Sequence, residues 1–141
     1  MNLRLICDGG CENNQNPLLR WAYGSYLLCQ YIPEQRLIVL RNESKISFGN
    51  LTNNEAEYLA LINALSQIPT LPTMEPIGEL RIQMDSKLVI NQVCGQWEVN
   101  APNLPLYVQR VRDILRQLKK NGTTIIFNHL PREEIVEYLG H

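Results

Sequence analysis

Short runs of apolar residues alternate with turn-forming residues along the first 50 positions of the chain. Residues 3–7 (LRLIC), 21–32 and 36–50 are rich in aliphatic, aromatic and β-branched side chains, and turn-forming stretches, such as CENNQNP after Gly10, separate these runs. Such runs are typical of β-strands, and consecutive strands joined by turns favour antiparallel pairing. We therefore expect an antiparallel three-stranded meander, with Asp8 at the end of its first strand.

Beyond residue 50 the apolar positions take the spacing of amphipathic helices. A first helix begins at residue 52 or 53, with Thr52 or Asn53 as its cap, and ends before Pro69. The later segments predict a strand at 79–85, a short helix at 86–95 capped by Asp85 or Ser86, a long helix at 103–122, a strand at 123–129 and a short helix at 132–139. This order predicts an α/β fold in which helices flank a mixed five-stranded sheet, with two strands added to the first three.

Composition and length narrow the class of protein. At 141 residues we expect a single domain over 1–141 without an additional substrate-binding domain. No apolar stretch approaches the roughly 18 residues of a membrane span, and no secretory signal is visible, so the expected location is cytoplasmic. The net charge of −1 gives no general attraction to polyanions, and the four cysteines lack the paired spacing of a zinc site.

Three carboxylates stand out against the apolar pattern: Asp8, Glu57 and Asp85. Taken singly, they could be a turn residue, an acid at the start of a helix and a helix cap. Two of them follow apolar strands, and Glu57 lies on the apolar stripe of its helix. If they converge, they repel one another unless a cation lies among them, and oxygen ligands without cysteine or histidine favour Mg²⁺ or Mn²⁺.

Four ordered motifs carry a family resemblance. The segments CDGG (7–10), TNNEAEYLALINAL (52–65), DSKLVINQV (85–93) and NHLPREE (128–134) together resemble type 1 ribonuclease H. The resemblance implies an endonuclease that hydrolyses the RNA strand of RNA–DNA hybrids, leaves 5′-phosphates and uses two Mg²⁺ or Mn²⁺ ions when substrate is bound. It assigns catalysis and metal binding to Asp8, Glu57 and Asp85.

The same resemblance implies residues that contact the substrate and move protons. It assigns hybrid binding to Gly9, to Thr52, Asn53 and Asn54, and to an asparagine of the preceding loop, which is Asn16 or Asn14. His129 matches a loop histidine that assists proton transfer or product departure. The alternatives are that the asparagines only start a helix and that His129 only ends a strand with a satisfied hydrogen bond.

The chain departs from the family pattern at two places. The position of the fourth acid is occupied by Leu139, so His141, Glu137 or no residue replaces that acid; of these we favour His141, which Gly140 frees from helical geometry. Segment 91–105 contains no lysine or arginine where the family has a basic helix and loop, which predicts modest affinity for the hybrid.

The expected partner is an RNA–DNA hybrid, with no membrane and no obligate protein partner, and we expect a monomer. Two other functions stay open. The chain could be a nucleic-acid-binding module of the same fold with weakened catalysis, or a related metal-dependent nuclease domain.

Overall fold

Five strands form one mixed sheet in the order β3-β2-β1-β4-β5. The computed structural model describes residues 1–32, 34, 37–73 and 75–140. The first three strands pair antiparallel, β4 lies parallel to β1, and β5 lies parallel to β4. The strands are β1 (Asn2–Glu12), β2 (Trp21–Tyr31), β3 (Ile38–Gly49), β4 (Glu79–Met84) and β5 (Thr124–His129). The predicted α/β architecture is confirmed.

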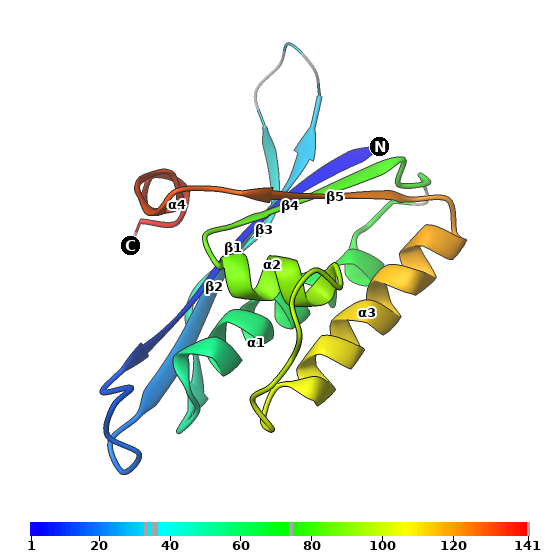
Figure 1. Ribbon diagram of the computed structural model, residues 1–141. Helices are drawn as coiled ribbons and strands as arrows, with labels where there is room; N and C mark the ends of the chain where they lie inside the picture. Colours follow the sequence, from blue (N-terminus) through cyan, green and yellow to red (C-terminus); the bar gives the residue numbers. More distant parts are fainter. Residues whose placement is uncertain (33, 35–36, 74, 141) are drawn as a thin grey trace.

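Helices cover both faces of this sheet. They are α1 (Asn53–Leu65), a 3-10 turn (Ile68–Thr70), α2 (Lys87–Val93), α3 (Pro105–Lys120) and α4 (Arg132–Leu139). Figure 1 shows α1, α2 and α3 grouped on one side of the sheet, with α4 set apart from them beyond β5. Across the described ranges, no helix combines the length and hydropathy needed to cross a membrane.

Alternation along β1 builds two apolar cores. Leu3, Leu5 and Cys7 point into a large core that α1 and α3 complete. Ile6 points to the other face, where it packs with Leu27, Cys29, Leu130 and Ile135 beneath α4. Both faces of β1 are therefore covered, which fixes the register of the central strand on which the site depends.

Helix capping gives some of the polar residues at the starts of α1 and α2 a structural role. Thr52 caps α1 in a reciprocal capping box with Glu55, and Ser86 caps α2 by accepting a hydrogen bond from the Val89 amide at 3.2 Å. Asp85 is therefore not the cap of α2. Glu57 lies beyond the residues that close the first turn of α1, so capping does not explain its carboxylate either.

The expectation that Asp8 ends the first strand is wrong, because β1 continues through two glycines to Glu12. A Cβ on Gly9 would lie 2.3 Å from the backbone of Ala56, and one on Gly10 would lie 2.5 Å from the Tyr23 ring. The glycines therefore do not open a turn; they let α1 and an aromatic ring approach the strand closely. Asp8 consequently sits inside a paired strand, which holds it more firmly than a turn would.

Candidate active site: a cluster of three carboxylates

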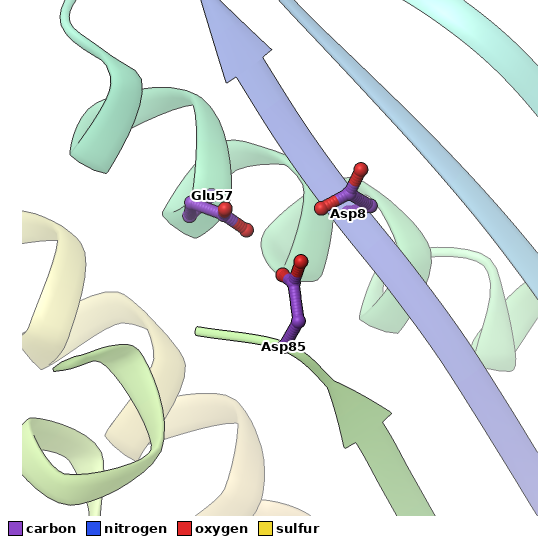
Figure 2. Close-up of side chains that lie close together, drawn as sticks. All are labelled: Asp8, Glu57 and Asp85. Atoms are coloured by element: carbon purple, nitrogen blue, oxygen red, sulfur yellow. The ribbon is translucent and has the colours of Figure 1, made fainter. Parts of the chain in front are cut away.

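Asp8, Glu57 and Asp85 converge from three different elements. Asp8 comes from β1, Glu57 from α1, and Asp85 from the residue that follows β4 (Figure 2). Each offers a carboxylate oxygen, and these oxygens all lie within 4.8 Å of one another. The parallel pairing of β1 and β4 brings the two aspartates to the same end of the sheet.

Burial makes this cluster electrostatically costly. Asp8 is 3% exposed and Glu57 is 7% exposed. Burial, aided by the nearby Asp85 charge, raises the pKa of Asp8 to about 6. Burial and then the charges of Asp8 and Asp85 raise the pKa of Glu57 well above its usual range. Asp8 and Glu57 therefore hold protons more strongly than free carboxyls do, and a bound cation would relieve the repulsion.

Hydrogen bonding orients the cluster without satisfying it. The Gly9 amide donates to Glu57 Oε2 at 3.1 Å, which ties α1 to β1. Asp8 Oδ1 is buried and has no hydrogen-bond partner within the part of the chain that the structure describes. A buried carboxylate oxygen without a donor is costly, and an oxygen-seeking divalent cation would satisfy it. The donor set of three carboxylates thus fits Mg²⁺ or Mn²⁺.

Arg132 is a site residue that the sequence analysis did not single out. Its Nη1 donates a short hydrogen bond to Asp8 Oδ2 and lies 3.5 Å from Asp85 Oδ2. The side chain is 51% exposed, so this guanidinium neutralises the cluster from the solvent side. The sequence could have pointed to Arg132. It is the one basic residue after His129 other than His141, and it lies within the motif NHLPREE (128–134).

His129 lies beside the carboxylate cluster, whereas the described C-terminal candidates for the fourth acid do not. His129 Nε2 lies 3.1 Å from the Asp85 carbonyl oxygen, so the ring borders the cluster. Within the described residues, Glu137 is not part of the carboxylate group, and Leu139 packs against the apolar core beneath α4. His141 lies outside the described residues, so its assignment stays a prediction.

The expected substrate residues gather around a cavity of about 310 Å³ at the start of α1. Thr52, Asn53 and Asn54 line it together with Asn14, whose Oδ1 accepts a hydrogen bond from the Asn53 amide at 2.9 Å. Asn16 is not among the lining residues and instead accepts from the Leu18 amide within its own loop.

Part of this arrangement is structural, because Thr52 caps α1 and the Asn14 side chain braces the Asn53 amide. Gly9 is buried against α1. Substrate contacts by Gly9, by the helix-start residues and by Asn16 or Asn14 therefore stay predictions; of the two loop asparagines, Asn14 is the one that accepts a hydrogen bond from α1.

Comparisons with known proteins place this geometry in a family. The family described as "Reverse transcriptase-like" matches residues 38–137. The chain belongs to this family, and the resemblance to type 1 ribonuclease H is confirmed. Among curated proteins, the "Bifunctional protein Rv2228c" of Mycobacterium tuberculosis is 36% identical over 110 residues, which cover 77% of this chain and 27% of that protein. The chain thus spans about a quarter of the length of that relative.

Two solved structures carry the same fold. The N-terminal RNase H domain of Rv2228c from Mycobacterium tuberculosis, solved as a fusion with maltose binding protein, is 25% identical with a TM-score of 0.75; the alignment covers 99% of this chain and 95% of that one. LC11-RNase H1, solved in complex with an RNA/DNA hybrid, is 25% identical with a TM-score of 0.76, and the alignment covers 97% and 92%.

Proposed function

We propose that this chain is a ribonuclease H: a metal-dependent endonuclease that hydrolyses the RNA strand of RNA–DNA hybrids and leaves 5′-phosphates. The convergence of Asp8, Glu57 and Asp85, with a buried Asp8 oxygen that lacks a donor, carries the proposal. The similarity to LC11-RNase H1, which was solved with an RNA/DNA hybrid, supports this substrate class.

In this proposal the three carboxylates hold two Mg²⁺ or Mn²⁺ ions when substrate is bound. Such ions supply an activated water and stabilise the leaving oxygen of the scissile phosphodiester. Asp8 lies within β1, Asp85 directly follows β4, and the Gly9 amide donates to Glu57, so the carboxylates would need little reorganisation on binding.

Two other groups act around the ligands. We assign proton transfer or product departure to His129, as the family resemblance implies; its Nε2 contacts the Asp85 carbonyl oxygen at 3.1 Å. Arg132 holds Asp8 Oδ2 and leaves Asp8 Oδ1 open to an ion; an ion that also used Oδ2 would displace the guanidinium. Released from Asp8, this exposed cation can face the substrate's phosphates.

A cleavage assay tests the proposal. An RNA–DNA hybrid labelled on the RNA strand is incubated with the protein in Mg²⁺, in Mn²⁺ and in excess EDTA, beside single-stranded RNA, duplex RNA and duplex DNA. We expect cleavage of the RNA strand of the hybrid in either metal and none in EDTA. Activity that persists in EDTA would refute the metal-dependent mechanism.

The assay also separates the alternatives left open by the sequence. Hybrid binding without cleavage in either metal would identify a binding module with weakened catalysis, for which the replacement of the fourth acid by Leu139 is the supporting observation. Faster cleavage of one of the other three substrates would identify a related nuclease domain.

A further inference from the structure

The face of the sheet that carries Asp8 extends past the carboxylate cluster to an aromatic ring. Asp8 and Gly10 lie on the same face of the sheet, because residues two apart along a strand share a face. Gly10 lies opposite Tyr23 in the β1–β2 register, and the Tyr23 ring covers the position where a Gly10 side chain would stand. Two residues along a strand span about 7 Å, so this ring adjoins the cluster.

Tyr23 belongs to a pair of rings that is fixed in place. The ring centroids of Trp21 and Tyr23 lie 5.3 Å apart with an angle of 34° between the ring planes. Trp21 Nε1 donates a hydrogen bond to Ser47 Oγ at 2.9 Å, which anchors the indole to β3. Neither ring is fully buried. An aromatic pair with one ring anchored to the sheet, and with both rings partly open to solvent, is a suitable surface for stacking.

Lys45 completes this surface from a bulge in β3. Its φ is +52°, a left-handed conformation that residues with a Cβ seldom adopt. The register of β2 and β3 shifts between Gly24 and Tyr26, and the Lys45 amide donates to Ser25 Oγ at 2.8 Å within this bulge. The bulge brings the exposed Lys45 ammonium to 5.6 Å from the Tyr23 ring centroid. Backbone strain that holds an exposed cation over an aromatic ring suggests a binding role.

We propose that Trp21, Tyr23 and Lys45 form a subsite for the nucleic-acid strand that runs through the carboxylate cluster. Lys45 contacts a phosphate near the scissile one, and the rings pack against an adjoining sugar or base. Charge supports this occupant, because a phosphate strand must pass three carboxylates, and Lys45 provides a cation on β3, at the opposite edge of the sheet from β5, which leads into the helix of Arg132. The inference rests on the proposed hydrolysis of hybrids and specifies where the strand lies.

The variant Lys45→Asn tests the charge with little change to the backbone, since asparagine also tolerates a positive φ. We expect KM for the hybrid, and Kd measured in EDTA, to rise roughly three- to tenfold while kcat changes less than about twofold. The slope of log Kd against log salt should fall by about one. Lys45→Arg should restore both values, and Tyr23→Leu should weaken binding without changing the slope.

Lys120→Asn, at the end of α3 on the other side of the sheet, is the matched control for loss of one positive charge. If wild type cleaves the hybrid but Lys45→Asn binds it as wild type does, or no worse than Lys120→Asn does, the subsite is overturned while the proposed function stands. If wild type neither cleaves nor binds the hybrid, the proposed function fails, and the subsite fails with it. Equal melting temperatures of Lys45→Asn and wild type show that folding is not the cause.

Discussion

The sheet and α1 supply three carboxylates to the site, whereas α4 supplies one exposed guanidinium. Asp8 lies in the paired strand β1, Asp85 directly follows β4, and Glu57 lies on the capped helix α1; Asp8 and Glu57 are buried. Helix α4 buries only Ile135 fully among its residues and turns Leu139 toward the apolar core beneath it. The negative charge of the site is therefore built into the sheet and α1, and its counter-charge lies on the half-exposed side chain of Arg132.

The largest expected effect is a loss of turnover when one of the three carboxylates is replaced. Asp85→Asn should lower turnover on the hybrid by at least about 10² to 10³, because it replaces one of the three proposed anionic metal ligands with a neutral amide. Its melting temperature without metal should be unchanged or slightly raised, since one repulsive charge is lost. Asp113→Asn, an exposed aspartate of α3, is the matched control and should keep full turnover. A large fall in the metal-free melting temperature of Asp85→Asn would argue against a repulsive cluster.

The next effect is a pH dependence of stability without metal. The pKa of Asp8 is about 6 in the folded state and about 3.9 unfolded, so the folded state binds more protons between these values. Stability should therefore fall as pH rises from about 4 to about 7, by at most about 3 kcal/mol from this group. Denaturant titrations in EDTA should show wild type losing stability relative to Asp8→Asn over this window. Parallel curves for the two proteins would show that Asp8 does not titrate in this way.

On α4, Leu139→Asp should lower the unfolding free energy by roughly 1 to 2 kcal/mol, because it places a charge against the apolar core that Leu139 now completes. Glu137→Gln is the control on the same helix, and its stability should match wild type. Stability of Leu139→Asp equal to wild type, measured by thermal unfolding in EDTA, would mean that the packing of Leu139 contributes little.

The smallest effect concerns the counter-charge. Arg132→Gln should cost about 0.5 to 1 kcal/mol of stability in EDTA, because an exposed ion pair contributes little. It should tighten Mn²⁺ binding by about two- to fivefold, since the guanidinium no longer competes for the oxygens of Asp8. Arg116→Gln, which breaks an exposed ion pair with Asp113 on α3, should leave Mn²⁺ affinity unchanged. Weaker Mn²⁺ binding by Arg132→Gln would show that Arg132 supports the ions.

The sequence predicted the sheet, α1 and their three carboxylates well, because the patterns that indicate them lie within short segments of the chain. Alternating apolar residues define β1, capping residues define α1, and an acid on an apolar stripe marks Glu57. The exception was the end of β1, where Gly9 and Gly10 resembled a turn. Only the packing of α1 and Tyr23 reveals that they allow close approach instead.

The α4 side could not be predicted in the same way, because its contacts join residues more than a hundred positions apart. The pairing of Arg132 with Asp8 depends on how α4 docks over the second apolar core. The bulge that directs Lys45 over Tyr23 likewise depends on strand register, which the composition of β3 does not specify. Long-range register and docking thus determine which charges approach the cluster.

Mn²⁺ binding followed by electron paramagnetic resonance tests the central claim most directly, because it reports the ions without requiring substrate. Wild type, Asp85→Asn and Asp113→Asn are titrated with Mn²⁺ at neutral pH. The account predicts saturable binding by wild type and by Asp113→Asn, and loss of that binding in Asp85→Asn. Equal binding by all three proteins, or none by wild type, would contradict a metal site formed by Asp8, Glu57 and Asp85.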